Sequence, residues 1–224
     1  MKQVLLTGAT GGIGSAIKRE FIKSGYKVVP LSSVDVDLTD RESIDSYFSN
    51  NKMQFDVVIH CAGINNPKLF EEIDYQDIDK TLDVNLLSFY RILHWVVPQM
   101  KKRKSGHILG ISSIYSVISR AKRLPYAISK HGMQGLIKTL ALEFGSHNIL
   151  INSISPGFID TKLTRRNISP KEIEGLKKKI ALGRLAAPQE IAKAAMFLCS
   201  SDNTYLTGQN IIVDGGFVIG GFEN

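Results

Sequence analysis

Cysteine is scarce in this chain, and long apolar runs are absent. The 224 residues contain only two cysteines, Cys61 and Cys199, which are too few and too far apart for a disulfide framework or a cysteine-based metal site. Both are expected to be small buried hydrophobic side chains. No stretch of eighteen or more apolar residues occurs, and the first residues, MKQVLLTGAT, have no signal-peptide cleavage pattern. The sequence therefore predicts a cytoplasmic protein with no membrane-spanning segment.

The sequence also lacks the residue spacing of a metal site. None of its five histidines lies at a metal-ligand or catalytic-triad spacing, so no metal is expected. The net charge of +7 is compatible with a nucleic-acid or anionic partner, and residues 101–104 form the basic run KKRK. Cations interact favourably with the dipole at a helix C-terminus. We therefore interpret this run as the solvated end of a helix and expect no nucleic-acid partner.

Short apolar segments alternate with segments of helical periodicity along the whole chain. The apolar segments predict strands at residues 3–9, 27–31, 55–63, 106–113, 149–157 and 210–216. Apolar residues at helical spacing predict helices at residues 14–25, 41–50, 81–103, 126–145 and 188–200. This alternation indicates a doubly wound α/β fold, in which helices cover both faces of a parallel sheet. No linker divides the chain, so residues 1–224 are expected to form one domain.

The first predicted strand leads into a glycine-rich turn, TGATGGIG at residues 7–14. Gly8, Gly12 and Gly14 stand where a strand gives way to a helix. At such a place backbone N–H groups and the helix dipole can bind a pyrophosphate. The alternative interpretation is a tight strand-to-helix turn with no ligand. The position after the first strand and before a helix favours a dinucleotide-binding site.

No acidic residue stands at the end of the second predicted strand. A dinucleotide site for NAD usually has an acid there, about twenty residues after the glycines, but Ser32 and Ser33 occupy this place. Without that negative charge a 2′-phosphate is not repelled, so NADP(H) is the favoured cofactor and NAD(H) the alternative. Asp37 is expected to accept a hydrogen bond from the adenine amino group or, with Thr39, to cap the helix at residues 41–50; the two roles are compatible.

Further segments match one known family in order and in spacing. Residues 7–14 resemble the T-G-x-x-x-G-x-G cofactor turn of the short-chain dehydrogenase/reductase family, and residues 61–63 resemble the end of its N-N-A-G segment. Asn85 falls where the family keeps a helix asparagine, and Ser113, Tyr126 and Lys130 follow in the expected order. Residues 155–161 resemble its nicotinamide-side loop, and residues 208–216 its last strand. The resemblance spans nearly the whole chain and implies a single-domain, Rossmann-type sheet of about seven strands.

The same resemblance implies an NAD(P)-dependent oxidoreductase that acts on a carbonyl or a CH–OH group of a small molecule. The implied catalytic residues are Asn85, Ser113, Tyr126 and Lys130. The expected cofactor contacts, which combine the family motifs with the glycine turn and the second strand, are Gly8, Thr10, Gly12, Ile13, Gly14, Ser32, Asp37, Leu38, Cys61, Ala62, Gly63, Tyr126, Lys130, Pro156, Gly157, Ile159 and Thr161.

The four-residue spacing of Tyr126 and Lys130 has a chemical reason. Hydride transfer to a ketone leaves negative charge on oxygen, which needs a proton and hydrogen-bond donors. A phenol is mostly protonated near neutral pH, and an ammonium group one helical turn away is expected to lower the pKa of Tyr126. Ser113, with Ser112 as its rival, is expected to orient the substrate oxygen. For Asn85 the resemblance implies a helix kink that holds a water, which would link Lys130 to solvent.

Residues 160–186 are charged and only partly periodic, and the resemblance implies that they form a substrate lid. The basic residues of this segment favour an anionic or carrier-bound substrate, with a solvated helix face as the alternative. These residues are Lys162, Arg165, Arg166, Lys171, Lys177, Lys178, Lys179 and Arg184. Residues 182–200 most resemble 3-oxoacyl-[acyl-carrier-protein] reductases, so reduction of a 3-oxoacyl thioester is one expected reaction.

Two other functions fit parts of the sequence. One is a non-catalytic NAD(P)-sensing regulator, which would keep the glycine turn and need not keep the catalytic set. The other is a sugar or nucleotide-sugar dehydrogenase or epimerase. The predicted helices at residues 81–103 and 126–145 are apolar over more than one face, so a partner subunit is expected to cover the excess. By the resemblance the chain is expected to form a homotetramer, with a homodimer as the alternative.

Overall fold

The computed structural model describes residues 1–51 and 53–220 and contains one parallel sheet of six strands in the order β2-β1-β3-β4-β5-β6. The strands are β1 (Gln3–Thr7), β2 (Lys27–Leu31), β3 (Val57–His60), β4 (Gly106–Ile111), β5 (Ile149–Pro156) and β6 (Asn210–Val213). This architecture confirms the doubly wound α/β fold, with six described strands where about seven were expected. The chain crosses to the other side of β1 between β2 and β3, so the carboxyl ends of β1 and β3 form the point where ligands bind in such sheets.

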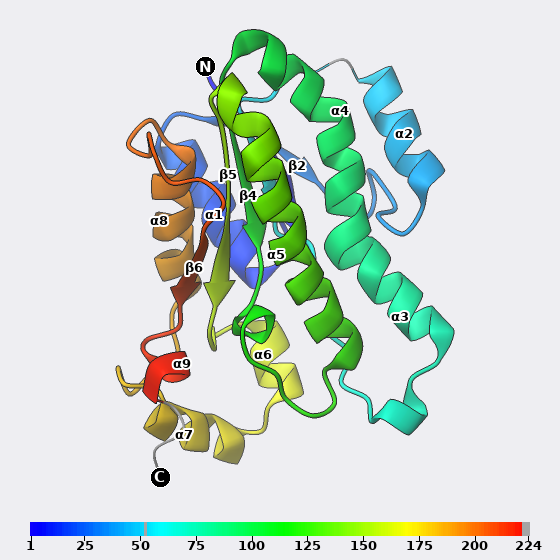
Figure 1. The fold of residues 1–224 in the computed structure, drawn as a ribbon. Coiled ribbons are helices and arrows are strands. Elements are labelled where there is room, and N and C mark those ends of the chain that lie inside the picture. The colour runs from blue at the N-terminus through cyan, green and yellow to red at the C-terminus, as the bar shows by residue number, and fades with distance from the viewer. Residues whose placement is uncertain (52, 221–224) are drawn as a thin grey trace.

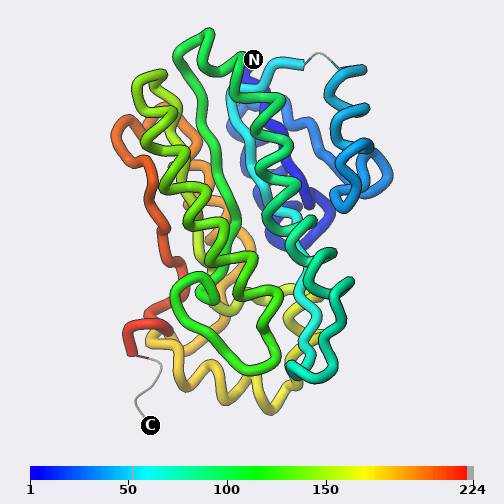
Figure 2. Tube along the Cα trace, turned by 45° about the vertical axis from the view of Figure 1, so that its right-hand side comes forward, coloured from blue at the N-terminus to red at the C-terminus, as the bar shows by residue number. Residues whose placement is uncertain are grey.

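Helices cover both faces of the sheet (Figure 1). Helices α1 (Gly12–Lys23) and α8 (Pro188–Cys199) lie on one face. Helices α2 (Arg41–Asn50), α4 (Ser88–Arg103) and α5 (Leu124–Phe144) lie on the other. Figure 2, turned by 45°, shows α4 and α5 running side by side across their face. Neighbouring residues of one strand point to opposite faces: Val4 and Leu6 join the core beneath α1 and α8, whereas Leu5 joins the other core.

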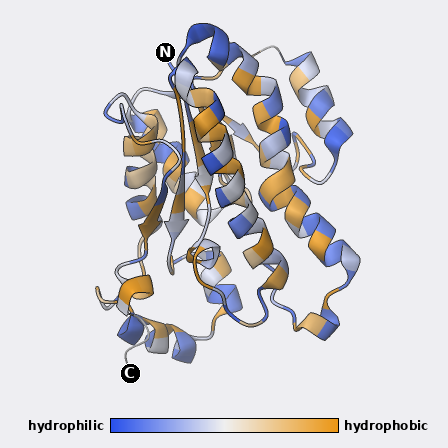
Figure 3. Ribbon diagram, viewed as in Figure 1, coloured by the Kyte–Doolittle hydropathy of each residue, from blue (hydrophilic) through white to orange (hydrophobic). Residues whose placement is uncertain are grey.

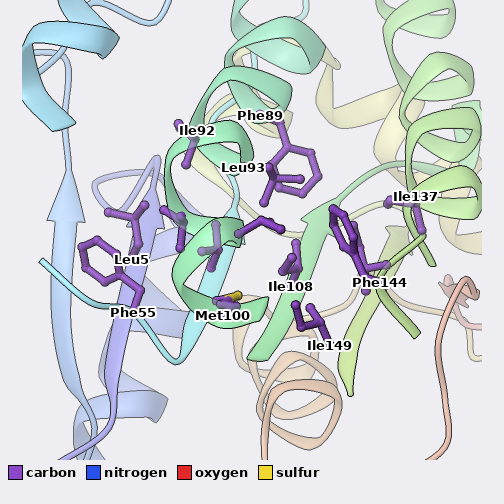
Figure 4. Close-up of a cluster of buried hydrophobic side chains, with 14 of the residues drawn as sticks. Leu5, Phe55, Phe89, Ile92, Leu93, Met100, Ile108, Ile137, Phe144 and Ile149 are labelled. Carbon is purple, nitrogen blue, oxygen red and sulfur yellow. The ribbon is translucent and has the colours of Figure 1, made fainter. Parts of the chain in front are cut away.

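The larger core lies between α4, α5 and the sheet (Figure 4). Phe89, Ile92 and Met100 extend from α4 and are fully buried, and Ile108 and Ile149 meet them from β4 and β5. This packing fixes the strands in register, so that the loops after β1, β3, β4 and β5 emerge together at the carboxyl end of the sheet.

The helix expected at residues 81–103 is interrupted. It consists of α3 (Tyr75–Leu82), a π-helical turn (Asp83–Leu87) and α4. The expected kink at Asn85 is therefore present as a π-helical turn, a feature often found at functional sites. Residues 101–103 form the last turn of α4, so the interpretation of the basic run as a helix end is confirmed.

Residues between β5 and α8 form two further helices, α6 (Lys162–Asn167) and α7 (Pro170–Lys179). Together with the short α9 (Phe217–Gly220) they lie beyond the ends to which the arrows of β4, β5 and β6 point (Figure 1). Helix α7 is mainly hydrophilic, whereas α2 and α4 alternate between hydrophobic and hydrophilic residues (Figure 3). Short 3₁₀ turns occupy Phe70–Glu72, Ile114–Ser116 and Gly145–His147. Within the described part of the chain, no helix is both long enough and apolar enough to span a bilayer.

Candidate active site

A cavity of about 260 Å³ opens at the carboxyl end of the sheet. Most of the predicted site residues line it, from the carboxyl ends of β1, β3, β4 and β5 with the loops that follow them, and from α1 and α5. They are Gly8, Gly12, Ile13, Gly14, Cys61, Gly63, Ser113, Tyr126, Lys130, Pro156, Gly157, Ile159 and Thr161. Six predicted residues do not line this cavity: Thr10, Ser32, Asp37, Leu38, Ala62 and Asn85.

The glycine turn leaves no space for side chains. Gly8 has a φ of +66°, a conformation that favours glycine, and a Cβ atom there would lie 2.7 Å from the backbone nitrogen of Ala62. A Cβ atom on Gly14 would lie 2.1 Å from the backbone oxygen of Gly8, and one on Gly12 would lie 2.7 Å from Cγ2 of Thr161. The turn is thus a cradle of bare backbone at the start of α1, as a pyrophosphate requires.

Ser32 and Ser33 follow β2, as expected from the sequence, and an acidic side chain three residues after Ser32 contacts this strand end. The backbone N–H and the hydroxyl of Ser32 both donate to one carboxylate oxygen of Asp35, at 2.9 and 2.6 Å. These hydrogen bonds hold the pKa of Asp35 below its usual value. The sequence argument considered the strand end alone, whereas the turn after β2 brings the carboxylate back to Ser32. The backbone N–H and the hydroxyl of Ser32 are thus already bonded to Asp35 and do not donate to a 2′-phosphate.

The expected capping of α2 is also corrected. Asp40 is the N-cap, and its carboxylate accepts a hydrogen bond from the backbone N–H of Glu42 at 2.9 Å. Asp37 instead accepts from the backbone N–H and the hydroxyl of Thr39, at 2.9 and 2.7 Å. Its predicted contact with adenine stays a prediction.

Lys130 is a buried lysine whose ammonium group lies within the cavity wall. It is 3% exposed, and its Nζ donates to the backbone oxygen of Ile111 at 2.8 Å. The same atom lies 5.5 Å from the ring centroid of Tyr126. Burial lowers the pKa of Lys130 to about 8. The lysine therefore stays close to its titration point near physiological pH.

The pKa of Tyr126 is raised to about 12, which overturns the expectation that Lys130 lowers it. Burial is the main cause, because the phenolate is disfavoured away from water. A hydrogen bond with the side chain of Ser113 acts in the opposite direction, as does the charge of Arg123. Lys130 is itself desolvated and is directed to the carbonyl group of Ile111, so its charge does not offset the burial of the phenol.

Ser113 and Ser112 are separated by their partners. Ser113 caps the short turn Ile114–Ser116, accepts from the backbone N–H of Tyr115 at 3.2 Å and hydrogen-bonds with Tyr126. The hydroxyl of Ser112 accepts from Nε2 of Gln134 at 2.9 Å. Ser113, rather than its rival, is therefore the serine that meets Tyr126.

Asn85 lies behind the cavity wall and holds the loop after β3. Its Oδ1 accepts from the backbone N–H of Ile64 at 2.8 Å, and its Nδ2 donates to the backbone oxygen of Ile64 and to Oγ of Ser129, both at 3.0 Å. Its side-chain amide is thus bonded to protein groups on both sides. The water predicted beside Asn85 stays a prediction.

Several cavity residues were not predicted from the sequence. They are Asn65, Tyr115, Arg123, Phe158 and Asn167, among others that line the same space. Arg123 had a signal in the sequence, because it lies three residues before Tyr126. In the described ranges 1–51 and 53–220, no group of three or more His, Cys, Asp or Glu side chains is placed to hold a metal ion.

The glycine turn can bind a dinucleotide at the switch point of the parallel sheet. A tyrosine with serine and lysine neighbours lies in the same cavity. This combination defines a dinucleotide-dependent oxidoreductase. Comparison with known proteins agrees. The family described as enoyl-(acyl carrier protein) reductase matches residues 25–218. The chain belongs to the short-chain dehydrogenase/reductase family, and it is an NAD(P)-dependent oxidoreductase.

Individual relatives extend this similarity over nearly the full chain. The chain is 33% identical to the 3-oxoacyl-[acyl-carrier-protein] reductase FabG of Thermotoga maritima, over 97% of this chain and 98% of that protein. A 4-hydroxyisoleucine dehydrogenase complexed with NADH is 30% identical, with a TM-score of 0.93, and the match covers 98% of this chain and 100% of that chain. ElxO with NADP bound is 27% identical, with a TM-score of 0.88 over 97% and 99% of the two chains.

Proposed function

We propose that the protein interconverts a ketone and a secondary alcohol with NADP(H), using Tyr126 as general acid and base. The observation that carries this proposal is that Tyr126, Ser113 and Lys130 line the same cavity as the glycine turn. NADP(H), when bound, supplies or accepts the hydride. The turn fits such a cofactor, because a Cβ at Gly8 or Gly14 would collide with the backbone of Ala62 or of Gly8, so only glycine allows the close backbone packing of this turn at the start of α1.

The chain's own residues then control the proton. Tyr126 is protonated at neutral pH, since its pKa is about 12, and it can donate a proton to a substrate oxygen held between it and Ser113. Lys130, with a pKa of about 8, can hold a positive charge near the phenol and return a proton to it. Asn85 positions this group through Ser129, one residue before Lys130. The predicted water beside Asn85 would complete the path to solvent.

The relatives differ in the substrates that their names give. One is named for 3-oxoacyl groups on a carrier protein and another for 4-hydroxyisoleucine. We therefore propose a carbonyl or CH–OH group as the reacting centre, with 3-oxoacyl thioesters as one class to be tested. A cytoplasmic location and the lack of a nucleic-acid partner stay predictions.

Residues 160–186 are proposed as the substrate lid. The two ends of this segment are joined, since the backbone N–H of Asp160 donates to the oxygen of Ala186 at 2.9 Å and the N–H of Ala186 to the oxygen of Phe158 at 3.0 Å. Because these hydrogen bonds join the two ends of the segment, they support its movement as one unit. Three of its basic residues are paired with acids, in the ion pairs Arg165–Asp160, Lys177–Glu174 and Arg184–Glu190, which favours a solvated face over a broadly basic rim.

A homotetramer or homodimer is proposed from the exposed apolar side chains of the α4 and α5 region. Tyr90 is 54% exposed and Leu142 is 87% exposed, and Leu87 and Ile128 are exposed as well. The two helices lie side by side on one face (Figure 2). A partner subunit would remove these side chains from water.

The choice between NADPH and NADH is expected to depend on Asp35. Replacing Asp35 with asparagine removes a negative charge from the donors of Ser32, so a 2′-phosphate meets less repulsion. The ratio of the Kd for NADH to the Kd for NADPH is expected to rise by about tenfold. Fluorescence titration of both cofactors measures this ratio, with Asp40→Asn as the control because Asp40 caps α2 instead. An unchanged ratio would place Asp35 outside the cofactor site.

The proposed function is tested by following NADPH and NADH oxidation at about 340 nm. The substrates are 3-oxoacyl thioesters, simple ketones and keto sugars. Turnover with at least one ketone supports the proposal. Tight cofactor binding with no turnover on the whole panel would favour the sensing regulator, and the absence of any cofactor binding would contradict the proposal at its first step.

A further inference from the structure

Arg123 is a buried cation in the active-site cavity whose charge no acid neutralises. It is 8% exposed and lines the cavity. Among residues 1–51 and 53–220, no carboxylate lies within ion-pair distance of it. Its Nε is buried without a hydrogen-bond partner, and its Nη1 lies 3.4 Å from Oδ1 of Asn65. Burial of an uncompensated charge is costly, so the arrangement indicates a site that a ligand completes.

Glu172 is an acid close enough to Arg123 to be affected by its charge, but its carboxylate is bound to other groups. The charge of Arg123 contributes to lowering the pKa of Glu172, after the larger effects of Ser169 and Arg120. The Glu172 carboxylate accepts from the backbone N–H and hydroxyl of Ser169, at 3.0 and 2.8 Å, and pairs with Arg120 at 3.7 Å. Its side chain is 53% exposed. Glu172 therefore does not fill the place beside Nε of Arg123.

The helix that follows adds to the positive potential. Arg123 is the N-cap of α5, a helix of 21 residues, and in the described structure no side chain caps this end. Unsatisfied N–H groups and the helix dipole favour an anion at such a terminus. Asn65, in the loop after β3, lines the same cavity and has an amide group that can donate a further hydrogen bond. The guanidinium of Arg123 and the amide of Asn65 thus lie next to each other in the cavity wall, at the start of α5.

This position lies close to the reacting centre. Arg123 precedes Tyr126 by three residues, and its charge is near enough to lower the pKa of Tyr126 in part. Both residues line the same cavity. A substrate that binds its oxygen at Tyr126 and Ser113 would reach Arg123 only if its anionic group lay within a few bonds of the carbonyl carbon. A long carrier-bound chain would place its negative charges farther away.

We propose that Arg123, with Asn65, binds a carboxylate of the substrate, so that the preferred substrate is a short oxo acid or the corresponding hydroxy acid. This proposal rests on the proposed function, since it takes the reacting oxygen to lie at Tyr126. A carboxylate is the chemistry that fits, because the N–H groups of the two Nη atoms of a guanidinium form a planar pair that matches its two oxygens. A neutral ester or thioester leaves the guanidinium without a partner.

The test compares each acid with its neutral form. The substrates are 3-oxobutanoate and 4-oxopentanoate, their methyl esters, the N-acetylcysteamine thioester of 3-oxobutanoate, and dihydroxyacetone phosphate. In Arg123→Gln, kcat/KM for the preferred acid is expected to fall about 100-fold more than kcat/KM for its ester, and this excess loss is expected mainly in KM. Arg123→Lys is expected to recover part of the loss, since it keeps the charge without the planar pair. Arg120→Gln, which removes an exposed charge from the same loop, is the matched control and is expected to change neither.

Two results would overturn the proposal. One is an equal loss for acid and ester in Arg123→Gln, which would assign Arg123 a role in folding. The other is a preference of the wild-type protein for the phosphate or the thioester over both acids. Isothermal titration of the acids in the presence of NADP⁺ gives a readout without turnover, and Arg123→Gln is expected to raise their Kd about 100-fold. If neutral ketones are turned over with no preference for acids, the carboxylate site is contradicted and the proposed function is kept. If acids bind in a way that depends on Arg123 but nothing is turned over, the proposed function is contradicted and the carboxylate site is kept.

Discussion

Tyr126→Phe is expected to lower kcat by about 10²- to 10⁴-fold, the range that a positioned general acid contributes. The pKa of the Tyr126 phenol, at about 12, keeps it protonated across the working range. Ser113 hydrogen-bonds with it and Lys130 lies beneath its ring. Phenylalanine keeps the ring in place and removes only the hydroxyl, so the Kd for NADPH is expected to stay within about threefold. Steady-state kinetics and fluorescence titration measure the two quantities.

A matched control separates this chemical loss from a loss of stability. Tyr26→Phe removes a phenol hydroxyl from a tyrosine that packs edge-to-face on Phe21, with ring centroids 5.2 Å apart, outside the cavity. It is expected to keep full turnover. Tyr126→Phe loses one hydrogen bond and is expected to cost about 1 kcal/mol of unfolding free energy. If Tyr126→Phe retained more than about a tenth of wild-type kcat, Tyr126 would not be the general acid.

The fold could be predicted because its signals are local and repeated. The apolar segment at residues 149–157 contains β5, which is buried except at the half-buried Leu150, and the helix at residues 41–50 coincides with α2. The bounds of a helix are harder to predict where a side-chain contact with a distant segment interrupts it. Asn85 lies in the π-helical turn that interrupts the helix expected at residues 81–103, and its side chain bonds the backbone of Ile64. This contact joins segments 21 residues apart. The resemblance implied the kink, but periodicity could not show the contact.

The sequence predicted which residues form the candidate site, but it did not predict the pKa values of their side chains. Spacing placed Tyr126 and Lys130 on one helix, but burial is the main cause of the pKa shift of each. Asp35 returns to Ser32 through a turn. His60 is fully buried, with Nδ1 at 3.1 Å from Oγ1 of Thr7 and its ring stacked on Phe89. These features depend on desolvation and on contacts between distant segments, which a sequence pattern does not contain.

Lys130→Met is expected to lower kcat/KM by about 10²-fold or more, and to do so without loss of stability at neutral pH. The ammonium group is part of the cavity wall beneath Tyr126, so its loss removes both the proton donor to the phenol and a charge beside the cofactor cradle. Lys138→Met is the control, because Lys138 lies exposed two turns farther along α5. Wild-type turnover in Lys130→Met would remove Lys130 from the catalytic set.

The pH dependence of stability gives a second, independent measure of Lys130. Its pKa is about 8 in the folded chain and 10.5 ordinarily, so between these values the unfolded state binds more protons than the folded state. The free energy of unfolding contributed by this group therefore rises with pH from about 8 to 10.5, by on the order of 3 kcal/mol. Below pH 8 the folded protein holds a buried charge, which Lys130→Met removes together with the hydrogen bond to Ile111. Urea denaturation of both proteins at pH 7, 8, 9 and 10 is expected to show Lys130→Met at least as stable at pH 7 and without this rise. If the difference in unfolding free energy between the wild type and Lys130→Met were the same at every pH, Lys130 would have its ordinary pKa in the folded protein. The burial of Lys130 would then not reduce the stability of the folded state.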